Sequence, residues 1–131
     1  MKGLRNIYIS LALSFSVFFS LVLLLTDAEL WTVAPSHAYG LIAFTAADVA
    51  MLLASLVGWR RTADIGVYYG VGKLVVFLGD ILTAPEFSST YIEFAAYLFS
   101  LWGYNGLLAS QAAVALTSYL QRRKTRLAQT S

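Results

Sequence analysis

The chain has 131 residues, of which 59% are hydrophobic and only 12% are charged, and its mean hydropathy is +0.70. A soluble globular domain has about half apolar and about a quarter charged residues, so this composition excludes that class. The net charge is +2 and there is no cysteine, which limits the chemistry and the partners that this chain can have. Without cysteine there are no disulfides, thiolate catalysts or iron–sulfur ligands, and the redox compartment stays undetermined. The basic residues stand in short clusters beside apolar runs, which indicates membrane orientation rather than a nucleic-acid partner.

The first apolar run, residues 7–26, predicts a transmembrane helix, because about 20 apolar residues cross a hydrocarbon core about 30 Å thick. Lys2 and Arg5 precede the run, as they would in a signal peptide. The run is longer than the usual signal core, so we expect a retained helix. Ser10 and Ser14 share one helix face and are typical of close helix packing.

The second run, residues 37–59, carries small side chains at Ala46, Ala50 and Ala54. Small residues four apart allow another helix backbone to approach closely, so we expect this face to pack against a neighbouring helix. Asp48 lies near the centre of the same run.

The third run, residues 65–83, holds Lys73 near its middle and Asp80 seven residues later. Ionisable groups at membrane depth are costly and face protein or water rather than lipid. Gly66 and Gly70 form a G-x-x-x-G pair, which predicts that this helix packs inside a bundle. Proline cannot continue a helix, so Ala84 and Pro85 predict its end.

The fourth run, residues 90–120, is about 45 Å long as one helix, which exceeds the hydrocarbon layer. It therefore tilts or projects into the cytoplasm, and a kink at the Gly103–Gly106 segment stays an alternative. A basic tail, residues 121–131, follows it.

The charges predict the orientation. Basic residues cluster at those ends of the runs that share one side of the membrane. In the opposite connections the charged residues are all acidic, and His37 is the only other ionisable side chain. By the positive-inside rule, both termini are cytoplasmic. We therefore expect a single all-α domain spanning residues 1–131, a four-transmembrane-helix bundle of a prokaryotic plasma membrane with the lipid bilayer and other membrane subunits as partners.

A polar layer is predicted at mid-membrane depth. Asp48 and Lys73 both come about 15–16 Å below the outer surface. They lie on consecutive helices, which we expect to be neighbours, so an ion pair between them is the simplest partner assignment. Asn105 comes at a similar depth in the fourth helix and joins the layer. Asp80 is shallower, on nearly the same helix face as Lys73.

This layer has two interpretations. In the first it is a structural clasp that fixes helix register or docks the chain on another subunit. In the second, Asp48, Lys73 and Asp80 line an aqueous path for protons or ions. We favour the clasp, because the helices offer few other water-compatible residues and Lys73 repels cations unless it is paired.

No catalytic or cofactor motif accompanies this layer. His37 is the sole histidine, so one chain cannot supply bis-histidine haem ligation, and no metal or cofactor is expected. Gly70-Val71-Gly72-Lys73 lacks the spacing of a phosphate loop. The sequence therefore predicts a non-catalytic accessory subunit of a membrane complex, with energy-transducing or redox complexes as a guess from base rates. A small homo-oligomeric transporter or channel is the alternative.

Overall fold

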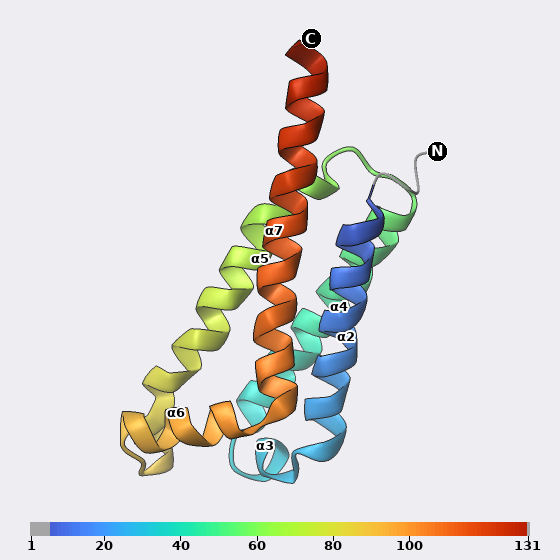
Figure 1. Ribbon diagram of the computed structural model, residues 1–131. Helices are drawn as coiled ribbons and strands as arrows, with labels where there is room; N and C mark the ends of the chain where they lie inside the picture. Colours follow the sequence, from blue (N-terminus) through green and yellow to red (C-terminus); the bar gives the residue numbers. More distant parts are fainter. Residues whose placement is uncertain (1–5, 131) are drawn as a thin grey trace.

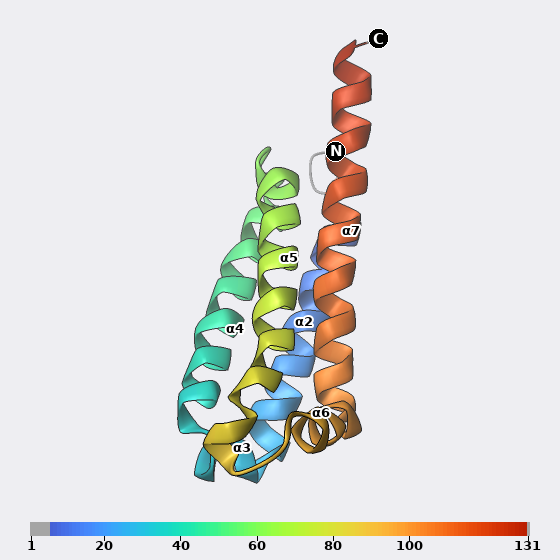
Figure 2. The same ribbon diagram turned by 90° about the vertical axis from the view of Figure 1, so that its left-hand side faces the viewer.

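The structure is a computed structural model that describes residues 6–130, and within this range it is helical without any strand. Four long helices run side by side as a bundle (Figure 1, Figure 2). They are α2 (Ile7–Thr26), α4 (Pro35–Leu56), α5 (Thr62–Gly79) and α7 (Trp102–Thr130). Three short helices gather at one end of the bundle, namely α3 (Ala28–Thr32), the 3₁₀ helix η1 (Asp80–Phe87) and α6 (Tyr91–Ser100). Lys2 and Arg5, on which part of the predicted orientation depends, lie outside the described residues.

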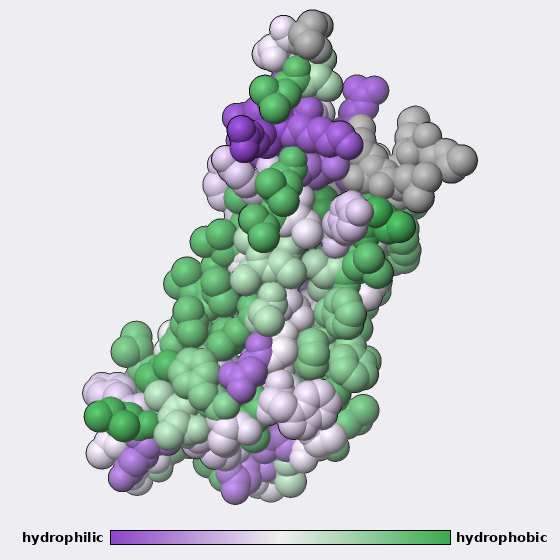
Figure 3. Space-filling view, viewed as in Figure 1, coloured by the Kyte–Doolittle hydropathy of each residue, from purple (hydrophilic) through white to green (hydrophobic). Residues whose placement is uncertain are grey.

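Three stretches of the described chain are long and apolar enough to cross a membrane: Ile7–Thr26, Pro35–Leu56 and Thr62–Phe87. Large apolar side chains cover the outside of the bundle, and Leu25 is 82% exposed. Figure 3 shows this apolar surface between two more polar ends. A soluble protein rarely exposes so much contiguous apolar surface, so these features indicate a membrane protein.

The helices do not pack in the order of the chain. α5 packs along α7, and α2 packs between α7 and α4, whereas α4 and α5 touch little although they are consecutive. The expectation that the second and third spans are neighbours is therefore corrected, whereas the first and second spans do pack together. The reason is the glycine face of α5: Gly66 lies against Ser118, and Gly70 lies against the backbone of Gln111 and Ala115. Glycine permits this close approach to α7.

The small face predicted on the second span is not the packing face. Ala46 and Ala50 are exposed and Ala54 is only partly buried. The buried residues of α4 are Ala38, Leu41, Asp48, Met51 and Ser55. At 100° per residue Ala46 points about 200° away from Asp48, so turning the carboxylate into the bundle turns the alanines out.

α4 also ends earlier than predicted, at Leu56 instead of residue 59. Gly58 has a φ of 75°, in the left-handed region where glycine has no steric cost. Its N–H donates to the carbonyl of Ser55 at 3.1 Å, and the N–H of Trp59 donates to that of Ala54 at 3.0 Å. A left-handed glycine that returns the chain to the last carbonyls is a standard helix stop.

The third span ends differently from the expectation at Pro85. The α-helix stops at Gly79 and tightens into η1, which contains Pro85 and continues to Phe87. The left-handed residue Ser88 (φ 55°) then reverses the chain. The apolar stretch that begins at Thr62 therefore continues to Phe87, and its last turns, in η1, pack against α6.

The predicted fourth helix, residues 90–120, is two helices. Thr90 and Glu93 form a capping box that starts α6, and Leu101 adopts an extended conformation (φ −84°, ψ 113°) that ends it. Figure 1 shows α6 lying across the end of the bundle and α7 turning up along it. The break lies just before the Gly103–Gly106 segment and not within it. α7 continues to Thr130, so most of the predicted basic tail, residues 121–131, belongs to this helix.

Candidate functional site

A buried ion pair lies at the centre of the four long helices. Lys73 Nζ on α5 donates to Asp48 Oδ1 on α4 at 2.7 Å and to Oδ2 at 2.8 Å. The two side chains are 1% and 0% exposed. The structure thus places together the two residues that the matching-depth argument paired.

Three neutral side chains complete this polar core. Ser16 Oγ on α2 donates to Asp48 Oδ2 at 2.6 Å, and Tyr69 OH on α5 donates to Oδ1 at 2.6 Å. Gln111 Nε2 on α7 donates to Ser16 Oγ at 2.7 Å. Each of the four long helices therefore contributes to one hydrogen-bonded unit.

The ion pair is saturated with hydrogen bonds. Asp48 accepts four, two on each oxygen, and Lys73 donates three, the third to Ser16 Oγ at 3.3 Å. Removing such charges from water costs several kcal/mol per ion, and attraction offsets this only when the remaining lone pairs and protons are satisfied. The rings of Phe44, Tyr69 and Phe77 also lie 5.2–5.5 Å from Nζ, at cation–π distance.

Asn105, predicted for this layer, lies elsewhere. It is exposed, and its Nδ2 donates to the carbonyl of Phe99 at 2.7 Å. This bond satisfies a carbonyl left free where α6 ends, so the amide serves the break at Leu101. The prediction placed Asn105 in the polar layer by counting residues along one continuous fourth helix. The break at Leu101 makes that count invalid.

Sequence reasoning missed Tyr69, Gln111 and the role of Ser16. Tyr69 precedes Lys73 by four residues and so shares its helix face, which was an available signal. Gln111 is the polar residue of α7 that the broken fourth helix brings to mid-depth. Ser16 was one of several serines in its run, and nothing in the sequence marked it above the others.

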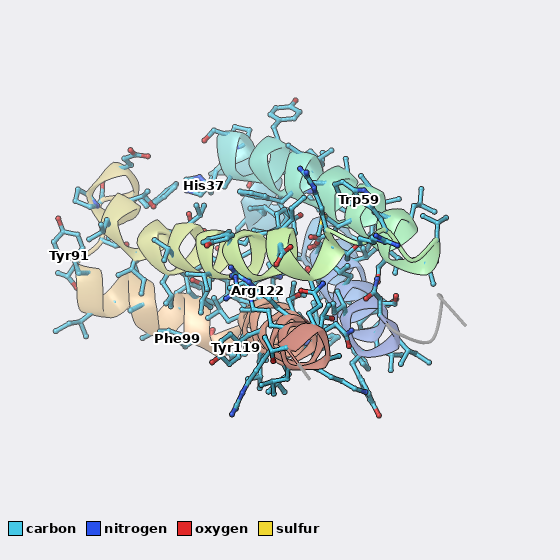
Figure 4. The ribbon with its side chains drawn as sticks, turned by 90° about the horizontal axis from the view of Figure 1, so that it is seen from above. His37, Trp59, Tyr91, Phe99, Tyr119 and Arg122 are labelled. Carbon is cyan, nitrogen blue, oxygen red and sulfur yellow. The ribbon has the colours of Figure 1, made fainter. Side chains whose placement is uncertain are left out.

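Asp80, also predicted for the layer, lies in a second site. It begins η1, and its Oδ1 is 3.7 Å from His37 Nε2 in the first turn of α4. His37 in turn stacks edge-on against Phe87, with ring centroids 5.9 Å apart. Figure 4 shows His37 in the space between the start of α4 and η1.

This second site is a cavity of about 590 Å³, which we call the outer cavity after the orientation that the charges predict. It lies at the end of the bundle where α3, η1 and α6 gather. Its wall is largely apolar and includes no lysine or arginine of the described chain. Its ionisable residues, besides tyrosines, are Asp27, Glu29, His37, Asp80 and Glu93.

Tyr97 of α6 shows the acidic character of this cavity. Its hydroxyl lies 3.5 Å from both carboxylate oxygens of Asp27. Burial, a hydrogen bond to Glu29 and the charges of Asp27 and Glu29 raise the pKa of Tyr97 well above its ordinary value. These acids disfavour the ionised phenolate, so the hydroxyl of Tyr97 remains a hydrogen-bond donor.

The outer cavity and the polar core are separated by one aromatic layer. Phe44 and Phe77 line the cavity, and their rings are each 5.5 Å from Lys73 Nζ. This arrangement can hold an apolar ligand with a positive group above the layer and keep the ion pair dry below it. Comparison of the chain with protein-family models, curated proteins and solved structures finds no match, so the site's geometry alone carries the functional argument.

Proposed function

We propose that this chain is a four-helix integral membrane protein in which α7 is the fourth span. α7 packs along both α5 and α2, so it reaches the same depth as these apolar helices. Residues 102–120 are about 28 Å long in helical geometry and precede the first charge of α7, Arg122. That length matches a hydrocarbon core of about 30 Å.

The positive-inside rule supports a topology with both termini in the cytoplasm. The α4–α5 connection holds Arg60 and Arg61, and the end of α7 holds four further basic residues between positions 122 and 126. The opposite end holds the carboxylates of the outer cavity. Basic residues near span ends mark the cytoplasmic side.

For the function, we propose a non-catalytic subunit of a membrane protein complex. The observation that carries this is the saturation of the Asp48–Lys73 ion pair. Every carboxylate oxygen of Asp48 and every proton of the Lys73 ammonium is used within the bundle. A group that is fully committed to neighbouring helices fixes their register and offers nothing to a passing ion.

Purification in a mild detergent tests this function. We expect a defined membrane protein to stay bound to the tagged full chain at constant stoichiometry through size-exclusion chromatography. Proteoliposomes of the chain alone should show no proton flux, and Asp48→Asn should leave that result unchanged. A chain that purifies as a monomer or small homo-oligomer and conducts protons would contradict the proposal.

One observation favours transport as a second candidate, namely that the outer cavity ends directly above the ion pair. Four carboxylates and an apolar wall suit an organic cation with a hydrophobic body. In this case Asp80 binds the cation, and opening of the Phe44–Phe77 layer connects it to Asp48 and Lys73.

Ethidium uptake into DNA-loaded proteoliposomes tests this candidate. Uptake should exceed that of protein-free liposomes, and Asp80→Asn or Asp48→Asn should abolish it. Glu86→Gln is the matched control, because Glu86 is an exposed acid of the same η1 helix that does not line the cavity. No uptake by the wild type, or equal loss in the control, would exclude it.

A further inference from the structure

A second cavity, of about 470 Å³, lies at the end of the bundle opposite to the outer cavity, and we call it the basic cavity. It lies between the start of α2, the α4–α5 connection and the end of α7. Its charged lining residues are Arg60, Arg61, Asp64, Arg122 and Arg126. Four guanidinium groups against one carboxylate make it an anion site by charge. Figure 4 shows Arg122 between α5 and α7.

One deeply buried donor of the lining is left without a hydrogen bond. Asn6 is only 2% exposed, and its Nδ2 has no partner among residues 6–130. Its side chain does not cap α2, although it occupies the N-cap position. Arg122 Nε forms an ion pair with Asp64 Oδ1 at 3.1 Å, which leaves the charges of the other three arginines without a carboxylate among the described lining residues. Buried donors are almost always satisfied, so the Asn6 amide points to an acceptor that occupies the cavity.

The backbone adds to the same preference. α2 and α5 both begin at this cavity, with Asn6 before α2 and Ala63 and Asp64 in the first turn of α5. A helix start presents free N–H groups and the positive end of the helix dipole. Oxyanions with several acceptor atoms, above all phosphates, suit such a set of donors.

We propose that the basic cavity binds a phosphate group, and that an anionic phospholipid headgroup supplies it. The cavity lies at the polar end of three apolar helices, which is the depth of the headgroup layer. Basic pockets between transmembrane helices at this level recognise anionic headgroups. The site is independent of the proposed subunit role, because it would be present in a lone chain as well.

Native mass spectrometry of the delipidated full chain in detergent tests the proposal with three probes. These are phosphatidylglycerol, phosphatidylcholine and inorganic phosphate. We expect phosphatidylglycerol to bind and phosphatidylcholine to bind at least about fivefold more weakly, because its choline charge faces the arginines. If inorganic phosphate binds as tightly and displaces phosphatidylglycerol, the phosphate site is confirmed and a soluble ligand is its source.

Two neighbouring arginines provide a matched pair of variants. Arg122→Gln should weaken phosphatidylglycerol binding about fivefold. Arg123→Gln should leave it unchanged, because Arg123 is exposed and does not line the cavity. Should Arg122→Gln fail to fold, Arg61→Gln removes an exposed lining charge instead. Equal losses for lining and control variants, or no binding of phosphatidylglycerol and phosphate, would overturn the proposal.

Discussion

Replacement of Lys73 with methionine is expected to lower the free energy of unfolding by about 3–5 kcal/mol, because it leaves the Asp48 carboxylate buried without a cation. Methionine keeps the length and most of the volume of the lysine side chain, so the loss reports the charge. Equilibrium unfolding of the purified chain in mixed micelles measures this difference. Asp80→Asn serves as the control, since its partly exposed carboxylate is 3.7 Å from His37 and such pairs contribute at most about 1 kcal/mol.

The double variant Lys73→Met with Asp48→Leu should recover most of that loss. Removing both charges also removes the desolvation cost, and apolar replacements of buried ion pairs are often neutral or stabilising. The coupling energy between the two positions should therefore be large and favourable. If the two single losses simply add, the two residues do not act as a pair, and the clasp interpretation is wrong.

The sequence was sufficient to predict the ion pair because a buried charge limits the possible arrangements strongly. One lysine at mid-membrane depth needs a carboxylate at the same depth, and Asp48 met that condition. The three apolar stretches were equally clear from length and hydropathy. The hydrogen-bonding residues around the pair were harder, because a serine or glutamine in a helix can also bond to its own preceding turn.

The orientation of α4 shows why local patterns were misleading there. Alanines four apart suggested a packing face, yet a buried carboxylate on the other face decided the rotation of the helix. A small face lowers the cost of close approach by a modest amount, whereas exposing Asp48 to lipid costs about 2.5–3.5 kcal/mol or more. The cost of exposing the carboxylate is the greater of the two, so it determines which side of α4 faces inward.

The outer cavity was not predictable from the sequence. It exists because the chain breaks at Leu101, which allows α6 to lie across the end of the bundle. Leucine is a good helix former, and neither proline nor glycine occupies that position. The local bond from the Asn105 side chain to the carbonyl of Phe99 accompanies the break, which brings Tyr97 of α6 close to Asp27 and adds Glu93 to the cavity wall.

A single methyl group at Gly70 is expected to separate α5 from α7. A Cβ at this position would lie 2.7 Å from the backbone nitrogen of Ala115 and 2.9 Å from the carbonyl oxygen of Gln111. Backbone atoms cannot rotate away as a side chain can, so Gly70→Ala should lower the free energy of unfolding by about 1–3 kcal/mol. It should also loosen the polar core, because Gln111 would shift with α7.

Gly72→Ala is the matched control for this variant, since a Cβ there meets nothing within 4 Å. It should be neutral or stabilising by up to about 1 kcal/mol, as alanine favours helix over glycine. Gly66→Ala should fall between the two, because the Ser118 hydroxyl can rotate away from the new Cβ, whereas Ser118 Cβ, at 2.9 Å, cannot. The same unfolding measurement in micelles ranks all three. If Gly70→Ala is as stable as Gly72→Ala, α5 and α7 are not in backbone contact, and the packing order of the bundle must be different.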